Sequence, residues 1–177
     1  RLALLGAAAV ATAAVSVIIA RRVIIPPSRR EEDVAIRSVD LDAGLVVLDS
    51  TADSRLPGEY SFWFTRESGH ARIGEIVAST PTTVTRRLLG VDSGDITTAR
   101  RGRLTGWFYL TPADLDVPFE DVAIATQLGP APAWLVPPAD SRRDRWAIHV
   151  HGRAVRRPET LRAVPIFRAA GYNSLVV

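Results

Sequence analysis

The chain of 177 residues contains no cysteine, no methionine and no lysine. The absence of cysteine excludes a disulfide framework, a thiolate nucleophile and a zinc site with cysteine ligands. The absence of cysteine is compatible with a location on either side of a membrane. All 22 basic residues are therefore arginine, and 19 acidic residues are spread among them to leave a net charge of +3. Because no basic stripe with interleaved aromatic residues is present, we expect no nucleic-acid partner.

One long uncharged run stands at the N-terminus. Leu2–Ala20 carries no charge, and Arg21 and Arg22 follow it. A helix needs about 20 predominantly apolar residues to span a bilayer, so the length fits a membrane anchor. A cleaved signal peptide and an alanine-rich soluble helix are the alternatives, since eight of these residues are alanine. We favour a single-pass transmembrane anchor over residues 1–25 and a location at the cell membrane, with the side left open.

The composition changes after this run. Residues 26–33 form a polar linker that begins with two prolines. From residue 34 to 118, short β-branched and aromatic stretches alternate with turn residues, which predicts a β-rich segment of several antiparallel strands. The expected strands begin near Val34 and then cover Leu45–Leu48, Tyr60–Phe64, Ala71–Val77, Thr82–Leu89 and Leu104–Leu110. A strong turn is expected at Gly90–Asp95, which is rich in glycine and aspartate.

Residues 119–177 begin with a pattern typical of a β-hairpin. Val122–Ala125 and Trp134–Val136 are short apolar runs on either side of the turn Gly129-Pro130. A polar turn over Ala139–Asp144 then leads to another apolar run, Trp146–Val150.

A strand–helix–strand pattern ends the chain. His151-Gly152-Arg153 interrupts the run Trp146–Val150, and a helix is expected over Glu159–Ala170, with a kink at Pro165. Gly171 supplies a C-terminal stop before the apolar run Leu175–Val177. Two strands joined by a helix at this spacing predict a βαβ unit and therefore a parallel strand pair.

The segments PAWLVPP, WAIHVHGR and GYNSLVV follow one another in this order. In this order they resemble the start of an α/β-hydrolase domain. The whole chain resembles actinobacterial membrane-anchored α/β hydrolases, which are serine hydrolases with a β-rich segment before the catalytic domain. The resemblance implies an α/β fold, in which residues 119–177 are the truncated N-terminal part of an α/β-hydrolase sheet. A β-rich segment and one N-terminal apolar transmembrane helix would precede this sheet.

The candidate site is the turn after Trp146–Val150. In the α/β-hydrolase family a His-Gly turn at this place helps to build the oxyanion hole, and the resemblance implies that role for Arg153, Gly152 and His151. On its own, such a turn serves to join a strand to a helix. Arg156 and Arg157 follow and are candidates for binding a carboxylate-bearing substrate, or else form a solvated loop face.

A nucleophile, an acid and a base are missing from this pattern. No serine lies in a Gly-x-Ser-x-Gly elbow, and the family places its histidine after the nucleophile. His149 fits a hydrogen-bonded core residue better than one ligand of a metal pair with His151. His70 follows Gly69 and is expected to be an exposed turn residue.

We therefore expect a fragment of a serine hydrolase that acts on a small-molecule ester or peptide-like acyl bond without a cofactor or metal. Its nucleophile, acid and base would lie beyond Val177, so the intact protein would be an esterase or a peptidase-like enzyme. The alternative is a membrane-tethered β-rich binding or interaction module without catalysis. A Gly-x-Ser-x-Gly between a strand and a helix beyond Val177 would favour the hydrolase.

Either hypothesis predicts that the 177-residue chain is inactive as an esterase. Hydrolysis of a p-nitrophenyl ester, followed by the release of p-nitrophenolate, should stay at the buffer background, because no residue in a nucleophile elbow is present. Burst kinetics with a stoichiometric first turnover would contradict this expectation.

Overall fold

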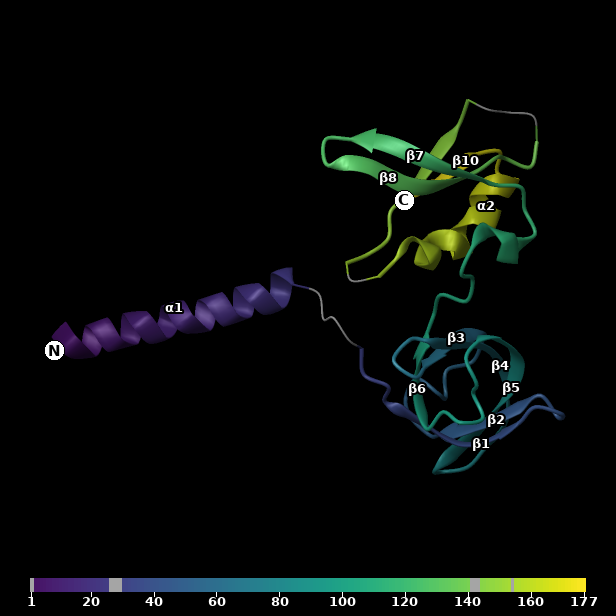
Figure 1. The fold of residues 1–177 in the computed structure, drawn as a ribbon, viewed down its shortest axis with the longest axis horizontal. Helices are drawn as coiled ribbons and strands as arrows, with labels where there is room; N and C mark the ends of the chain where they lie inside the picture. The colour runs from purple at the N-terminus through teal and green to yellow at the C-terminus, as the bar shows by residue number, and fades with distance from the viewer. Residues whose placement is uncertain (1, 26–29, 141–143, 154) are drawn as a thin grey trace. The chain divides into compact units, whose positions relative to one another are not determined.

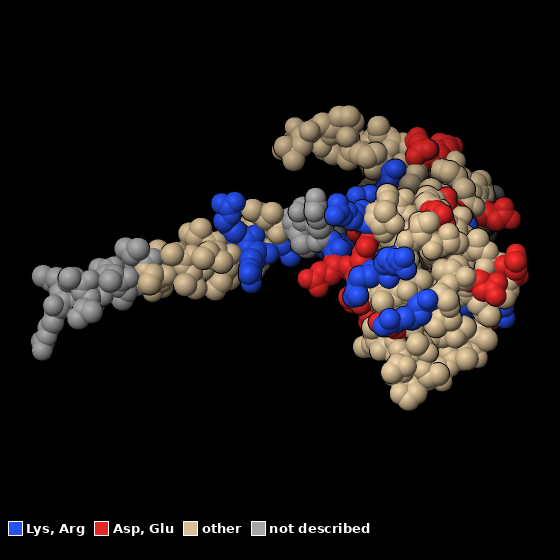
Figure 2. All heavy atoms as spheres, turned by 60° about the horizontal axis from the view of Figure 1, so that its bottom comes forward, with Lys and Arg blue, Asp and Glu red and all other residues tan. Residues whose placement is uncertain are grey.

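The computed structural model describes residues 2–25, 30–140, 144–153 and 155–177. The chain divides into two compact units, Arg1–Arg30 and Glu31–Val177 (Figure 1). The predicted linker over residues 26–33 and the predicted turn over residues 139–144 lie in part outside the described residues. On the face of the molecule drawn in Figure 2, arginine and acidic side chains of the second unit both occur, so this face carries charges of both signs.

The first unit contains helix α1 (Leu2–Ile24). Among the described residues, no helix combines the length and the apolar character that crossing a membrane requires. The predicted transmembrane anchor over residues 1–25, and the cell-membrane location derived from it, were therefore wrong. The prediction counted uncharged residues, whereas alanine is only weakly apolar and α1 continues through Arg21 and Arg22.

The second unit begins with a closed β-barrel of six antiparallel strands. The strands are β1 (Val34–Asp40), β2 (Leu45–Asp49), β3 (Tyr60–Phe64), β4 (Gly69–Ser79), β5 (Thr83–Ser93) and β6 (Arg101–Thr105). Their spatial order is β1-β2-β5-β4-β3-β6, and pairing of β6 with β1 closes the barrel. Closure leaves the barrel without a free edge strand.

Alternating apolar side chains fill the barrel. The buried residues of this core are Val34, Val46, Leu48, Phe62, Phe64, Ala71, Ile73 and Ile96. Phe62 and Phe64 are both fully buried. Their rings lie so close to Gly102 and Gly69, respectively, that a Cβ at either glycine would overlap the neighbouring ring. These two glycines therefore let adjacent strands carry large aromatic residues inside a narrow barrel.

Two predicted boundaries in the barrel were wrong. The turn expected at Gly90–Asp95 is part of β5 as far as Ser93, because Gly90 and Val91 pair with residues of β4. The β4–β5 pairing contains register shifts, which bend the strands around the barrel. The strand expected over Leu104–Leu110 ends at Thr105. Non-local pairing thus overrides the local turn and strand preferences.

The buried side chain of Arg86 joins two barrel elements through hydrogen bonds to backbone carbonyls. The side chain of Arg86 is fully buried on β5. Its guanidinium donates to the carbonyl of Gly74 on β4 through Nε at 2.9 Å and Nη2 at 2.6 Å. It also donates to three carbonyls in the loop between β2 and β3: Ser54, Leu56 and Gly58, at 3.2, 2.9 and 2.6 Å. Burial lowers the pKa of Arg86, and the Tyr60 ring lies 5.2 Å from the guanidinium carbon.

A four-stranded sheet follows the 3-10 helix η1 (Pro112–Leu115). Its strands are β7 (Glu120–Thr126), β8 (Gly129–Val136), β9 (Trp146–His149) and β10 (Asn173–Val176), in the order β7-β8-β10-β9. The predicted hairpin is present as the antiparallel pair β7–β8, but its turn is at Gln127-Leu128, since Gly129 and Pro130 already pair with β7. The predicted parallel pair is present as β9–β10.

The segment between β9 and β10 is helical but shorter than expected. It consists of the 3-10 helix η2 (Arg157–Ala163) and the helix α2 (Val164–Ala169). Pro165 lies in the first turn of α2, where its missing N–H is tolerated, so it marks a helix start and not a kink. Buried residues of these helices and of one sheet face form a second core: Trp134, Val136, Leu161, Val164 and Val176.

The expected α/β-hydrolase fold, and the resemblance from which it was derived, were wrong. The described part of residues 31–177 is mainly β, with a closed barrel and a small mixed sheet. An α/β-hydrolase sheet is covered by helices on both faces. Here η2 and α2 cover one face, and Trp146 and Ile148 of β9 are 54% and 66% exposed. A local strand–helix–strand pattern specifies a parallel pair, but it does not specify the sheet around that pair.

The Arg86 contacts predict a large loss of stability on substitution. Arg86→Met leaves four backbone carbonyls without their donor and should lower the free energy of unfolding in urea by about 3 kcal/mol or more. Arg87→Met is the matched control, because the neighbouring side chain is 42% exposed and makes only surface contacts, with Glu75 at 3.3 Å and the carbonyl of Ala43 at 3.4 Å. The control should change stability by about 0.5 kcal/mol at most. Equal losses in the two variants would contradict the role assigned to Arg86.

Candidate functional site

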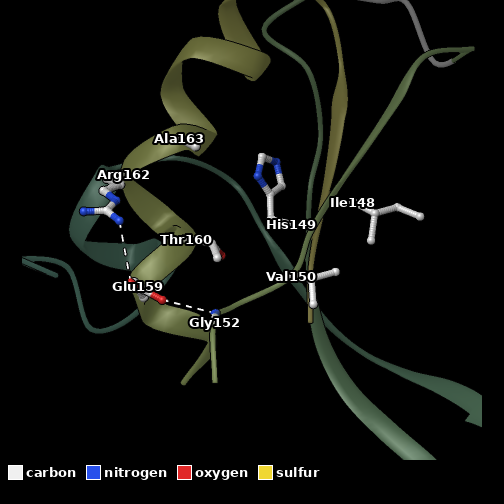
Figure 3. A pocket seen from close by; sticks show the side chains of 8 residues that line it. All are labelled: Ile148, His149, Val150, Gly152, Glu159, Thr160, Arg162 and Ala163. Carbon is white, nitrogen blue, oxygen red and sulfur yellow. Dashed lines mark hydrogen bonds and ion pairs between the residues drawn. The ribbon is translucent and has the colours of Figure 1, made fainter. Parts of the chain in front are cut away.

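The turn after β9 lies beside a cavity that polar and apolar groups line. The cavity, called here the β9 cavity, has a volume of about 420 Å³. Its lining residues are Ile148, His149, Val150, Gly152, Glu159, Thr160, Arg162 and Ala163. They come from the end of β9, the following turn and η2, so the βαβ connection builds both walls (Figure 3).

The backbone of Gly152 already binds an anionic oxygen. Its N–H donates to Oε2 of Glu159 over 3.3 Å, and Oε1 of Glu159 lies 3.6 Å from Nη2 of Arg162. Figure 3 shows this chain of contacts along the edge of the cavity. Glu159 and Arg162 are three residues apart in a 3-10 helix, which places them on one face. The turn therefore offers an amide donor, and η2 adds one carboxylate and one guanidinium.

His149 forms the inner wall of the cavity. It is 8% exposed, its Nε2 lies 3.0 Å from Oγ of Ser174, and the Phe167 ring packs against it edge-on. Burial lowers the pKa of His149, so the imidazole is neutral near pH 7. The prediction of a hydrogen-bonded core histidine is confirmed.

The other predicted site residues lie in different places. Gly152 lines the cavity, whereas His151, Arg153 and Arg156 are not among the residues that line it. His151 lies beyond the end of β9, and its Nδ1 is 2.9 Å from the carbonyl of Gly152. The guanidinium carbon of Arg157 lies 3.8 Å from the centre of the Trp134 ring, a cation–π contact against the second core.

Glu159, Thr160 and Arg162 were missed by the sequence prediction. The three-residue spacing of Glu159 and Arg162 within the expected helix was the available indication, but which helix face meets the turn depends on how η2 packs. The Thr160 hydroxyl donates to the carbonyl of Arg157 at 3.0 Å. It is the only hydroxyl among the described residues that line the β9 cavity. The arrangement is suited to binding an anionic group.

A second polar cluster lies on the outer side of the barrel, around His70. The imidazole Nδ1 donates to Oδ2 of Asp92 at 2.7 Å, and Nε2 lies 2.8 Å from Oγ of Ser61. Oγ of Ser61 also lies 2.6 Å from the carbonyl of Trp107. His70 is 1% exposed, so the expectation of an exposed turn residue was wrong. His70 lies on β4, which pairs with β3 on one side and with β5 on the other.

The distances in this cluster are those of a serine–histidine–aspartate triad, but access differs. Ser61 is fully buried, and neither it nor His70 lines the β9 cavity or the smaller described cavity of about 140 Å³ at the barrel end. Arg72 completes the cluster by donating to Oδ1 of Asp92 at 2.6 Å. The contacts tie β3, β4 and β5 to the segment after β6, which assigns them a structural role.

Burial and hydrogen bonding oppose each other at His70. Burial lowers its pKa, and the bond to Asp92 raises it by a smaller amount, so the net direction is downward from 6.5. With a neutral ring, the single Ser61 proton has two acceptors, Nε2 and the Trp107 carbonyl. For Asp92, burial raises the pKa, but the bonds from Arg72 and His70 together outweigh this and lower it from 3.8.

No group of three or more histidine, cysteine or acidic side chains suited to a metal occurs in the part of the chain that the structure describes. The metal pair that His149 and His151 offer in sequence is not formed, because one ring is directed into the sheet and the other to its own turn.

Comparison with known proteins adds one match. A family model described as "Domain of unknown function (DUF8805)" matches residues 35–105. The matched segment corresponds closely to the six barrel strands, β1 to β6. No curated protein and no solved structure shows a significant match to the chain.

The lowered pKa of His70 predicts a pH-dependent stability. A histidine with a pKa lowered by folding stabilises the protein fully above its unfolded value of 6.5, and this stability is lost as the pH falls through the folded value. Urea unfolding midpoints measured below pH 6.5 should therefore fall less steeply for His70→Gln than for the unchanged chain. The midpoint of His70→Gln should still fall to some extent as the pH decreases, because the pKa of His149 is also lowered.

His149→Gln is the companion variant, and the two effects should add because the residues lie in different sheets. The stability that the lowered pKa of Asp92 contributes is lost at lower pH, below about pH 4. Parallel pH profiles of His70→Gln and the unchanged chain between pH 6.5 and 5 would contradict the assignment.

Proposed function

We propose that the chain is a β-rich binding module without catalysis, and that the β9 cavity takes a small carboxylate-bearing ligand. The observation that carries this proposal is the hydrogen bond from the Gly152 N–H to the Glu159 carboxylate. The Gly152 N–H at the cavity edge donates to a protein carboxylate, so the same N–H has the geometry to donate to the carboxylate of a ligand.

The electrostatics of the cavity support an exchange of one carboxylate for another. The Glu159 side chain is 28% exposed, so it has room to turn into solvent when a ligand arrives. A ligand carboxylate would then gain both the Gly152 amide and the Arg162 guanidinium. The neutral His149 adds no competing charge. The net charge of the site stays unchanged by such an exchange.

The walls of the cavity favour a short apolar group next to the carboxylate. Val150 and Ala163 line it together with His149. A volume of about 420 Å³ lies within the usual range for small-molecule sites. The ligand class is therefore a small organic acid with an aliphatic or aromatic group.

Binding is favoured over catalysis by the state of the hydroxyl groups. The Thr160 hydroxyl is bonded to a backbone carbonyl. The Ser174 hydroxyl beside His149 and the Ser61 hydroxyl beside His70 are fully buried, and neither residue lines the β9 cavity or the cavity at the barrel end. A nucleophile needs a base beside it and access for the substrate. The hydroxyls next to the two buried histidines do not combine these features.

Propionate and its neutral analogue propionamide provide a direct test. In a titration followed by amide NMR spectra, propionate should shift the Gly152 signal with saturation, and propionamide should not. Gly152→Pro removes the donor and should weaken propionate binding about tenfold or more, since a hydrogen bond to a charged group contributes about 1.5–3 kcal/mol. Equal shifts with both probes, or none, would contradict the proposal.

Removing the competing carboxylate should strengthen binding. Glu159→Gln keeps the side-chain shape and removes the charge, so propionate should bind about fivefold more tightly, which corresponds to about 1 kcal/mol. Glu75→Gln is the matched control, because Glu75 also forms a surface pair with an arginine, Arg87 at 3.3 Å, but on the barrel. An equal gain in both variants would show a general charge effect and no site.

A further inference from the structure

β9 is an edge strand with hydrogen-bonding groups on its open side. The N–H groups of Asn173 and Val177 donate to the carbonyls of Arg145 and His149, at 2.9 and 3.0 Å. Successive residues of a strand direct their backbone groups to opposite sides. The N–H and C=O of Ile148, and of its even-numbered neighbours, are therefore directed away from β10. In the described sheet β9 pairs with β10 alone.

Apolar side chains flank this open edge. Trp146, Ile148 and Val150 are 54%, 66% and 70% exposed. Figure 3 shows Ile148 on the side of β9 opposite to His149 and the helix. The register places Leu175 and then Leu135 next to Ile148, so an apolar row crosses the sheet. Soluble proteins usually protect such edges with lysine, proline or a bulge, and Trp146–Val150 contains none of these.

We propose that two copies of the chain pair through β9 in antiparallel orientation, about a two-fold axis at Ile148. The two four-stranded sheets then form one continuous sheet. Ile148 lies opposite Ile148 of the partner copy, and Trp146 lies opposite Val150 of the partner copy. Both are hydrogen-bonded pairs, because these are the residues whose backbone groups are directed to the edge.

The sequence of the edge favours a second copy over an unrelated peptide. Reversal about Ile148 places an aromatic residue opposite a β-branched one on both sides of the axis, which is a favourable cross-strand pair. It also brings Asp144 of one copy to the end of the strand where the partner copy carries Arg153. The two-fold arrangement repeats this approach of unlike charges at both ends of the interface.

The area of the contact sets its strength. The exposed parts of the three apolar side chains amount to roughly 400 Å² per copy, so the pair buries about 800 Å², below the about 1,200 Å² typical of stable complexes. The dimer is therefore weak and reversible, and it forms at high micromolar concentration. A sheet edge with four to five residues supplies the hydrogen bonds that fix its register.

A disulfide test follows from the lack of cysteine in the chain. Ile148→Cys places one thiol at the two-fold axis, where the expected Cα separation of about 5.5 Å matches that of a disulfide. Under mild oxidation it should form a covalent dimer about tenfold faster than Ile166→Cys, whose position on α2 is 72% exposed. Equal rates for the two variants would overturn the proposal.

Sedimentation of the full chain gives an independent readout. The weight-average mass should rise from monomer toward dimer between micromolar and millimolar concentration. Ile148→Lys places two like charges at the axis and should abolish this rise. Val91→Lys, at an exposed position of the barrel, should leave it unchanged. Association that persists in Ile148→Lys, for example through α1, would overturn the proposal, as would a monomer at every concentration.

Discussion

The guanidinium of Arg86 is the constraint on which the barrel depends. It is a fully buried charge whose acceptors are backbone carbonyls, on β4 and on the loop between β2 and β3. A buried charge is costly unless its donors are all used, and the delocalised, weakly hydrated guanidinium is the cation best suited to this task. Because the loop and two strands share one side chain, they are ordered together. The apolar core formed around Phe62 and Phe64 fills the rest of the barrel.

The His70 cluster and the Gly152 turn contain similar groups with different consequences. Both combine a histidine, a carboxylate and an arginine within a small volume. In the first, His70 and Ser61 are buried on the outer side of the barrel, and the groups hydrogen-bond to each other. In the second, the amide and the Glu159 carboxylate lie beside a cavity. Access to solvent, and not the identity of the side chains, separates a structural cluster from a binding site.

The mixed sheet has two different faces, and its proposed roles follow from this asymmetry. The helices η2 and α2 pack on one face, where they build the second core and the β9 cavity. The opposite face carries the apolar row that ends at the edge strand β9. A ligand in the cavity and a second copy at the edge would both contact this part of the chain, because Ile148 and Val150 line the cavity and also lie at the edge.

Much of the local structure followed from the sequence, because side-chain periodicity and turn residues act over a few positions. The strand Tyr60–Phe64, the hairpin β7–β8 and the parallel pair β9–β10 were predicted in this way. The chemical features of the turn at Gly152 were also apparent, although its carboxylate partner was not.

Tertiary structure decided the remaining features, since they depend on contacts between residues distant in sequence. Pairing with β4 extended β5 through residues typical of a turn, and it enclosed His70 between strands. Closure of the barrel and the single helical layer on the mixed sheet overturned the α/β-hydrolase interpretation. By itself, the sequence determined the approximate positions of most strands, but not where each strand ends. Which side chains are buried, and which remain accessible to a ligand, was decided by the non-local pairing of those strands.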